Sequence, residues 1–234
     1  KMTGIEVLLM CGIAGFCRWD GDFTRDREGW SQVLVRMRRS LAHRGHDQTG
    51  EYLDRWVGLA HTRLSIRDLA GGGQPMVRQR AGKDFAIVYN GEIYNTGELA
   101  PELEKLGYRF ETTCDTEVIL YAYMAWGLDF AEKLNGIYAL AVWDGAEGRL
   151  VLCRDRLGVK PLFYTVKGDA LVFGSEPKAL FCHPQVRPEA DGDSFREIFG
   201  VGPARTPGAG VFRGVGEVKP GHLAVFDRES FRQS

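Results

Sequence analysis

The chain has 234 residues, of which 44% are hydrophobic and 26% are charged, and its formal net charge is −1. This composition is ordinary for a soluble globular protein, and the length allows one large domain or two small ones. The balanced charge gives no basic footprint for nucleic acid or a membrane surface. Because the apolar run near the start is also too short to span a bilayer, the sequence predicts neither a nucleic-acid nor a membrane partner.

The cysteines and histidines show no pattern of a metal site. Five cysteines are present, namely Cys11, Cys17, Cys114, Cys153 and Cys182, and they form no CxxC pair and no zinc spacing. The five histidines are scattered along the chain. We therefore expect no metal. An odd number of unpatterned cysteines is typical of reduced thiols, so a cytoplasmic location is expected.

Apolar periodicity and turn residues predict the following elements in chain order. Strands are expected at residues 13–19, 57–66, 85–89, 109–112, 137–143, 150–154, 162–165, 170–174 and 222–226. Helices are expected at residues 25–41, 96–106, 115–126, 130–134, 175–181 and 195–199. The adjacent hairpins in the second half favour antiparallel sheet, and the mixture predicts an α+β fold with two sheets between helical layers.

A cysteine near the start of the chain is the first candidate for chemistry. Cys11 lies between Met10 and Gly12, ahead of a predicted strand. If translation starts at Met10 and that methionine is removed, Cys11 carries a thiol and a free α-amine. The amine, with a pKa of roughly 7.7–8.0, can accept the thiol proton. The alternative is that Cys11 is a small buried apolar residue without chemistry.

Two further positions place polar groups at the ends of predicted elements. Asn90 and Gly91 follow the apolar strand 85–89 and supply a side-chain amide and an unhindered backbone N–H, the two donors that an oxyanion hole needs. The same pair is also typical of a tight turn. Asp115 opens the predicted helix 115–126, where its simplest role is that of a cap. The residues alone leave these alternatives open.

Eight motifs along the chain resemble those of a known family. They occupy residues 10–15, 42–45, 63–66, 72–76, 89–95, 115–118, 154–162 and 174–180. In this order and spacing, the chain resembles the class II glutamine amidotransferase domain of the glutamine-hydrolysing asparagine synthetases. The resemblance implies the N-terminal-nucleophile hydrolase fold, a four-layer αββα sandwich of two mainly antiparallel sheets.

The resemblance also implies a role for each matched residue. Cys11 attacks the side-chain amide of glutamine with its own α-amine as the base, and Asn90 and Gly91 hold the oxyanion. Arg63 pairs with the substrate α-carboxylate and Asp115 with its α-ammonium, which suits a zwitterion because it needs one fixed cation and one fixed anion. The further substrate-binding positions implied are Leu64, Ser65, Ile66, Arg67 and Glu92.

The resemblance implies limits for the domain as well. Residues 1–10 are expected to be a leader, tag or propeptide, residues 11–227 the amidotransferase domain, and residues 228–234 the start of a linker. The chain contains no Ser-Gly-Gly-x-Asp-Ser pyrophosphate loop, so ATP and Mg are expected only for an absent synthetase domain and no cofactor is expected here. The expected partners are L-glutamine and a synthetase domain or separate synthetase subunit, with a homodimer as a further candidate assembly.

Three functions remain as hypotheses. The first is the glutaminase domain of an enzyme of the asparagine synthetase type. The second keeps the fold but delivers ammonia to another amide-forming synthetase. The third is a non-catalytic regulatory or scaffold domain in which residues 1–10 block Cys11, and the complete set of Cys11, Arg63, Asn90 and Asp115 argues against it.

Overall fold

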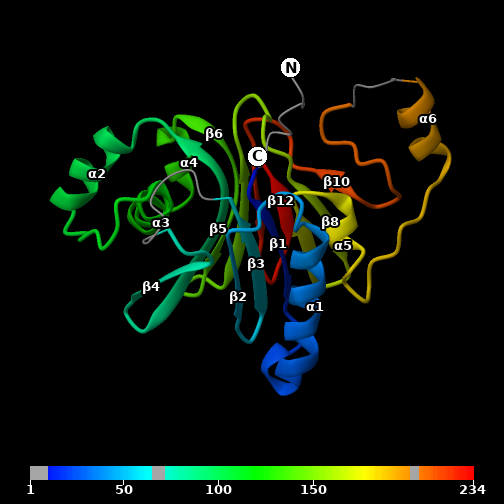
Figure 1. Cartoon of the computed structure of the whole chain (residues 1–234), viewed down its shortest axis with the longest axis horizontal. Coiled ribbons are helices and arrows are strands. Elements are labelled where there is room, and N and C mark those ends of the chain that lie inside the picture. The colour runs from blue at the N-terminus through cyan, green and yellow to red at the C-terminus, as the bar shows by residue number, and fades with distance from the viewer. Residues whose placement is uncertain (1–9, 65–71, 201–205) are drawn as a thin grey trace, which may run out of the picture.

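Two antiparallel sheets organise the chain (Figure 1). The computed structural model describes residues 10–64, 72–200 and 206–234. Within these residues, one six-stranded sheet has the order β10-β8-β9-β1-β3-β2 and the other has the order β12-β11-β7-β6-β5-β4. We call them the first and the second sheet. Strand β1 begins directly after Cys11, and β5, the neighbour of the edge strand β4, contains Asn90 and Gly91, so the sheets position the site.

The elements have the following bounds. The first sheet consists of β1 (Gly12–Arg18), β2 (Gln48–Leu53), β3 (Val57–Arg63), β8 (Phe163–Lys167), β9 (Ala170–Gly174) and β10 (Gly216–Glu217). The second sheet consists of β4 (Met76–Arg80), β5 (Lys83–Ile93), β6 (Gly136–Asp144), β7 (Arg149–Arg154), β11 (Leu223–Phe226) and β12 (Phe231–Gln233). The helices are α1 (Arg27–Ser40), α2 (Thr96–Lys105), α3 (Asp115–Trp126), α4 (Phe130–Lys133), α5 (Pro177–Leu180) and α6 (Gly192–Gly200), with short 3-10 turns at Phe23–Asp26 and Gly127–Asp129.

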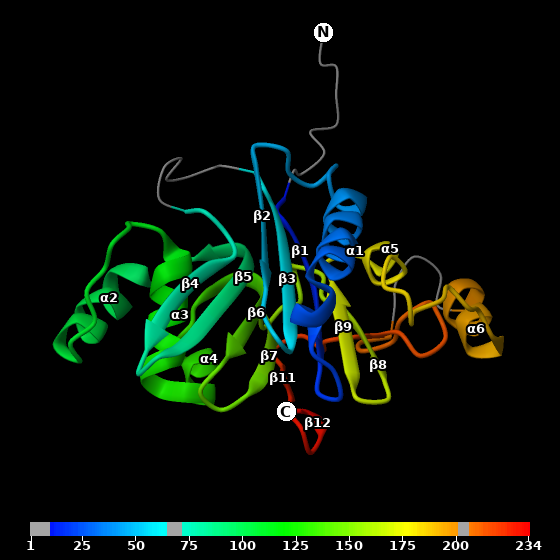
Figure 2. The same cartoon turned by 90° about the horizontal axis from the view of Figure 1, so that it is seen from below.

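The elements stack in four layers, which Figure 2 shows from the side. Helices α2, α3 and α4 cover the outer face of the second sheet, and α1 and α5 cover the outer face of the first. A third apolar core fills the space between the two sheets, where Ile13 of β1 and Val88 of β5 belong to one buried cluster. Alternate residues of a strand face opposite sides, so each sheet buries both faces. The predicted αββα sandwich is confirmed.

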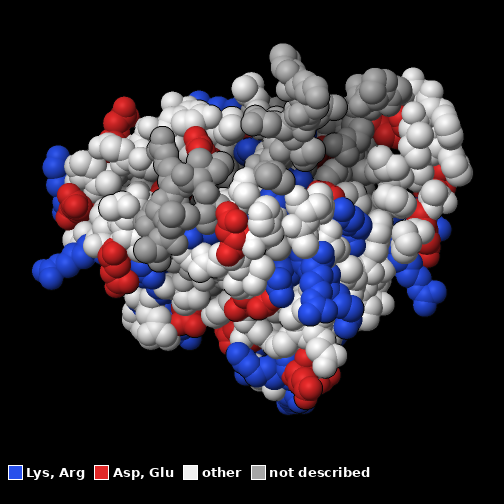
Figure 3. All heavy atoms as spheres, viewed as in Figure 1, with Lys and Arg blue, Asp and Glu red and all other residues white. Residues whose placement is uncertain are grey.

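Helix α1 forms because its sequence has one apolar and one charged face. Its buried residues are Val33, Leu34 and Met37, which pack in the core over the first sheet. Its exposed side chains include Arg27, Arg36 and Arg39, and on the face shown in Figure 3 Lys and Arg gather over this helix. The basic face is therefore the solvent side of an amphipathic helix that covers the sheet.

Most predicted elements occur at the predicted positions, but the strand predicted at residues 109–112 is wrong. The backbone N–H groups of Glu111 and Thr112 donate to the side-chain carboxylate of Glu117, at 3.2 and 2.8 Å. These groups are thus bound by helix α3 and not by a sheet ladder. Four strands were not predicted, namely β2, β4, β10 and β12. The last of them lies within residues 228–234, the segment expected to begin a linker.

The pair Asn90-Gly91 does not form a turn. Strand β5 continues through it to Ile93 and pairs with β6, so that Gly91 lies opposite Tyr138. A Cβ atom at Gly91 would lie 2.2 Å from the carbonyl oxygen of Ile137. Glycine is therefore required here because two strands approach closely.

Candidate active site

Cys11 lies at the start of β1, where several groups fix its backbone. The guanidinium Nε of Arg44 donates to the Cys11 carbonyl at 3.1 Å, and the next residue, Gly12, donates its N–H to Thr62 Oγ1 at 3.2 Å. The Leu64 N–H donates to Cys11 Sγ at 3.4 Å. The sulfur is thus held at the ends of two neighbouring strands, β1 and β3.

The thiol opens into a cavity of about 440 Å³. Of the predicted site residues, the structure places Cys11, Arg63, Leu64, Asn90, Gly91, Glu92 and Asp115 around this cavity. Ser65, Ile66 and Arg67 lie outside the described residues. Residues from the first sheet, the second sheet and α3 therefore meet at one cavity large enough for an amino acid.

The electrostatic surroundings leave the Cys11 thiol in need of a base. Burial raises the pKa of this thiol, although the hydrogen bond from Leu64 and the charge of Arg63 act in the opposite direction. A thiol with a raised pKa is largely protonated at neutral pH, and the thiolate is the nucleophile. The α-amine that could take the proton exists only when Cys11 is the first residue, because with Met10 attached its nitrogen is an amide.

The backbone N–H of Gly91 points toward the cavity from the edge of the second sheet. Strand β5 extends beyond the end of its neighbour β4. On this uncovered edge, the Tyr89 N–H donates to Gln74 Oε1 at 2.6 Å. Two positions past Gly91, the Ile93 N–H points to Asp115 Oδ2 at 3.4 Å. Because every second N–H of a strand points to the same edge, the Gly91 N–H lies between these two donors, and it has no acceptor among the described residues.

The side chain of Asn90 supplies a second donor. Asn90 is buried with only 2% exposure, and its Nδ2 has no hydrogen-bond partner in the described part of the chain. A buried amide without a partner costs free energy, and such atoms are typical of sites that bind a ligand. Asn90 and Gly91 together therefore offer two unsatisfied donors at one position of the cavity wall, the arrangement that an oxyanion needs.

Arg63 is a cationic group at the wall of the cavity. Its side chain at the end of β3 donates from Nη1 to Gln48 Oε1 on β2 at 3.0 Å. A Cβ atom at Gly72 would lie 2.4 Å from its Nη2, so the glycine leaves room for the guanidinium. The guanidinium fork is suited to a carboxylate.

Asp115, at the first turn of α3, is an anionic group at the wall of the cavity. The Tyr89 hydroxyl donates to its Oδ2 at 2.7 Å, and the Ile93 N–H points to the same oxygen. Burial raises the pKa of this carboxyl, and the hydrogen bonds from Tyr89 and Ile93 counteract part of that increase. The carboxylate is held in a fixed position where it can pair with a substrate cation.

Besides Arg44 and Thr62, which fix the nucleophile, four residues that contribute to the site were not identified from the sequence. Gln48 holds Arg63, Gln74 holds the Tyr89 backbone, and the Tyr89 hydroxyl holds Asp115. Lys160 lines the same cavity. Three of these residues lie inside the family motifs, which could have indicated their roles: Gln74, Tyr89 and Lys160. Gln48 lies outside all of the motifs.

Lys160 is held by a loop after β7. The buried carboxylate of Asp155 accepts the backbone N–H groups of Val159 and Lys160, both at 3.0 Å. The Lys160 Nζ contacts Met10 Sδ at 3.0 Å, next to Cys11. Burial, together with the charge of Arg44, lowers the pKa of Lys160. This loop therefore places an amine at the cavity wall, beside the residue that precedes Cys11.

Two further properties concern only the residues that the structure describes. No group of three or more His, Cys, Asp or Glu side chains there could hold a metal ion. None of the helices in the described ranges combines the length and the apolar character that crossing a membrane requires.

Comparisons of the sequence identify relatives along most of the chain. A family model described as "Glutamine amidotransferase domain" matches residues 10–234. The chain is 44% identical over 220 residues to a Bacillus subtilis (strain 168) protein named asparagine synthetase (glutamine-hydrolyzing) 3, covering 94% of this chain and 35% of that protein. It is 37% identical over 173 residues to asparagine synthetase B (glutamine-hydrolyzing) of Escherichia coli (strain K12), covering 73% of this chain and 30% of that protein. The chain thus spans about a third of the length of these relatives.

A comparison of structures supports the same fold. Glutamine phosphoribosylpyrophosphate amidotransferase from B. subtilis superimposes with a TM-score of 0.67 at 20% sequence identity, covering 96% of this chain and 49% of that one. At this identity the likeness concerns the fold alone. The family match over residues 10–234 shows that the chain belongs to the glutamine amidotransferase domain family.

Proposed function

We propose that this chain is a glutaminase, which hydrolyses L-glutamine to glutamate and ammonia. The observation that carries the proposal is the cavity in which the nucleophile Cys11 lies with two unpartnered donors, and whose wall also carries the cation Arg63 and the anion Asp115. Glutamine has one group for each: a carboxamide carbon, its carbonyl oxygen, an α-carboxylate and an α-ammonium. A zwitterion bound at both ends leaves its side-chain amide as the group that reaches the cysteine.

The reaction proceeds in two halves. The neutral α-amine of a terminal Cys11 takes the thiol proton, and the sulfur attacks the carboxamide carbon. The resulting oxyanion accepts hydrogen bonds from Asn90 Nδ2 and the Gly91 N–H. The ammonium then gives its proton to the leaving nitrogen, the C–N bond breaks, and ammonia departs from a thioester. Water attacks the thioester with the amine as base, which releases glutamate and restores the thiol.

The acceptor of the ammonia belongs to the part of the relatives that this chain does not cover. Because the relatives named above are asparagine synthetases, we propose that the ammonia passes to a synthetase domain or subunit that uses ATP and Mg to make asparagine from aspartate. Another amide-forming synthetase would use the same glutaminase half. A cytoplasmic location and a homodimer stay predictions. A non-catalytic scaffold is disfavoured because Asn90 Nδ2 is buried without a partner.

The test is the intact mass of the protein expressed from its own gene, before and after a diazo-ketone analogue of glutamine. We expect a mass that corresponds to a chain beginning at Cys11. The analogue should add one adduct, which Cys11→Ala lacks, and the untreated protein should form glutamate from glutamine. A mass that retains residues before Cys11, with no adduct and no glutamate, would place the scaffold function first.

A further inference from the structure

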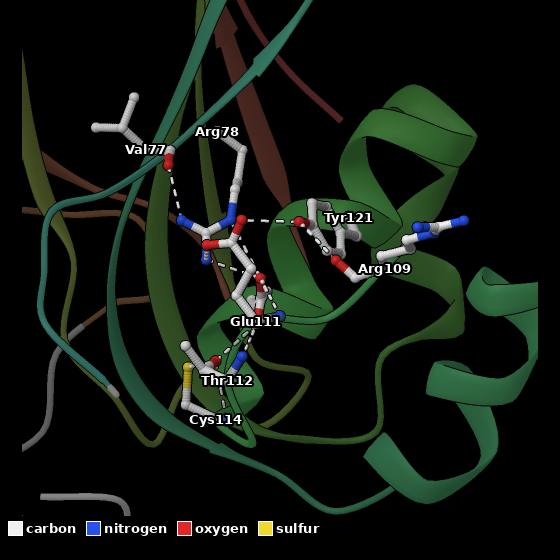
Figure 4. Close-up of polar contacts among 8 residues, drawn as sticks. Val77, Arg78, Arg109, Glu111, Thr112, Cys114 and Tyr121 are labelled. Atoms are coloured by element: carbon white, nitrogen blue, oxygen red, sulfur yellow. Dashed lines mark hydrogen bonds and ion pairs between the residues drawn. The ribbon is translucent and has the colours of Figure 1, made fainter. Parts of the chain in front are cut away.

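A buried carboxylate that does not line the cavity binds the loop that precedes α3, and Figure 4 shows its partners Arg78, Glu111 and Thr112. Glu117, in the first turn of α3, has a fully buried side chain. Its Oε2 accepts the Thr112 N–H at 2.8 Å and the Thr112 hydroxyl at 2.7 Å, and both oxygens accept the Glu111 N–H at 3.2 Å. Arg78 on β4 donates to Oε1 from Nη2 at 2.7 Å and from Nε at 3.1 Å.

The number of donors explains why this buried charge is tolerated. Burial alone opposes ionisation, but the hydrogen bonds from Thr112 and Arg78 and from two backbone N–H groups outweigh it, so the pKa of Glu117 lies below its usual range. A buried carboxylate with a full set of donors is stable in one geometry only. The network therefore holds the loop in a single conformation.

The loop that Glu117 fixes leads directly into the cavity. The Thr112 hydroxyl, which donates to Glu117, accepts the Cys114 N–H at 3.3 Å. The next residues, Thr113, Cys114 and Asp115, line the cavity. From β4 to the cavity wall, the order of contacts is thus Arg78, Glu117, Thr112, Cys114 and Asp115.

We propose that Glu117 is a positioning residue, which sets the place of the Asp115 carboxylate for the α-ammonium of the substrate; this inference rests on the proposed glutaminase function. Glu117 itself does not line the cavity. It acts on the part of the cavity wall that Asp115 forms, through the contact of Thr112 with Cys114. The interaction with the α-ammonium is present in the bound substrate and in the transition state alike, so its loss raises KM and leaves kcat largely intact.

The experiment compares two substrates of the protein whose first residue is Cys11: L-glutamine and 5-amino-5-oxopentanoate, which is glutamine without its α-amine. Glu117→Gln keeps the shape but points an NH₂ group at hydrogen-bond donors. We expect KM for glutamine to rise about 10-fold, with kcat within 3-fold of the wild type. The kcat/KM for the des-amino compound should change by less than 2-fold, so the preference for glutamine falls about 10-fold.

A second buried carboxylate provides a matched control. The Asp144 carboxylate accepts hydrogen bonds from the Tyr123 hydroxyl at 2.7 Å and from the backbone N–H groups of Ala146 and Glu147, both at 3.0 Å. It also forms an ion pair with Arg149 at 3.3 Å. Its loop does not line the cavity. Asp144→Asn should therefore reduce Tm as Glu117→Gln does, but leave the preference for glutamine unchanged.

Each outcome decides a point. If Glu117→Gln lowers kcat/KM equally for both substrates, or changes it for neither, the positioning role is overturned. If Glu117→Gln does not fold, Thr112→Val removes one hydroxyl from the same network and should lower the preference for glutamine about 3-fold; an unchanged preference there also overturns it. If the wild type hydrolyses neither compound, the proposed function is refuted, and the positioning role with it. A failure of the positioning role alone is recognised because the wild type is then active and only the behaviour of the variant differs from the expectation.

Discussion

The hydroxyl of Tyr89 donates a hydrogen bond to Asp115 Oδ2 at 2.7 Å, which joins a strand of the second sheet to the first turn of α3. Burial and the neighbouring Asp115 charge raise the pKa of Tyr89 well above its usual range, so this hydroxyl keeps its proton and remains a donor. The pair therefore fixes one oxygen of the carboxylate at the cavity wall. The same burial that orients Asp115 makes its charge costly to the fold.

Asp115→Asn should make the protein more stable and less active. Burial raises the pKa of the folded carboxyl above the ordinary value of about 3.9. The stability that the protonated form supplies is therefore lost as pH rises through the folded pKa, and asparagine avoids this loss. We expect a higher free energy of unfolding at pH 7, and a KM for glutamine raised about 10- to 150-fold through loss of a charged hydrogen bond.

Urea unfolding at two pH values and steady-state kinetics test this. The stability difference between wild type and Asp115→Asn should vanish near pH 3, where the wild-type carboxyl is protonated in both the folded and the unfolded state. An Asp115→Asn variant that is less stable than the wild type at pH 7 would contradict the expectation.

Asn90→Ala should be nearly as damaging as Cys11→Ala. The Nδ2 of Asn90 is a preformed donor that no described residue occupies, and removal of one oxyanion donor costs about 2.7–4 kcal/mol of barrier. We expect kcat for glutamine hydrolysis to fall about 10²- to 10³-fold while KM changes little. Wild-type turnover in Asn90→Ala would show that the oxyanion assignment is wrong.

Arg63→Lys should weaken glutamine binding although the charge is kept. The guanidinium is a planar fork held by Gln48, and a lysine ammonium cannot pair with a carboxylate at two points. We expect kcat/KM to fall about 10- to 100-fold, mostly through KM. Gln48→Ala should also lower kcat/KM, but by a smaller factor. If Arg63→Lys lowered only kcat and left KM unchanged, the carboxylate role of Arg63 would be refuted.

His61 should make the fold sensitive to acid. Burial, assisted by the charge of Arg63, lowers the pKa of His61 to about 3, and its Nε2 lies 3.2 Å from the Tyr89 carbonyl across the two sheets. Between pH 6.5 and this value the unfolded state binds one proton more, so stability falls as pH falls, by about 1.4 kcal/mol per pH unit.

His61→Gln keeps a donor for the Tyr89 carbonyl and removes the titration. Chemical unfolding between pH 4 and 6 gives the free energy of unfolding as a function of pH. The slope of this plot should be shallower in His61→Gln than in the wild type, by the equivalent of about one proton. His46→Gln, at a side chain that is 69% exposed, is the control. An unchanged slope in His61→Gln would mean that other groups cause the acid sensitivity.

The sequence predicts the parts of the fold that depend on local pattern. Helix α3 has the predicted bounds, Asp115–Trp126, because it combines a long apolar stretch with a clear start. Strands β2 and β4 were not predicted because their residues are largely polar or half-exposed and carry no apolar run. Residues 109–112 alternate as a strand does, yet a side chain from α3 binds their backbone.

The candidate site divides in the same way. Residue type and place make Cys11 and Asn90 candidates, whereas the substrate role of Asp115 was predicted from the family motifs, because its position alone indicates a helix cap. The supporting residues were not predicted, because their roles arise between elements that are distant in sequence. The Tyr89 hydroxyl, for example, meets a carboxylate 26 positions away, and no local pattern of the chain indicates that contact.

The uneven lengths of β4 and β5 have a further consequence. An unpaired strand edge usually invites another chain to add to the sheet. Here β4 leaves uncovered a stretch of β5 with outward N–H groups at Tyr89, Gly91 and Ile93, of which the first and last are already occupied. Among the described residues, the Gly91 N–H is the one of these three donors that has no acceptor, and a single donor suits one oxygen atom better than an added strand. Lengthening β4 by a few residues would therefore close the site without changing any reactive group.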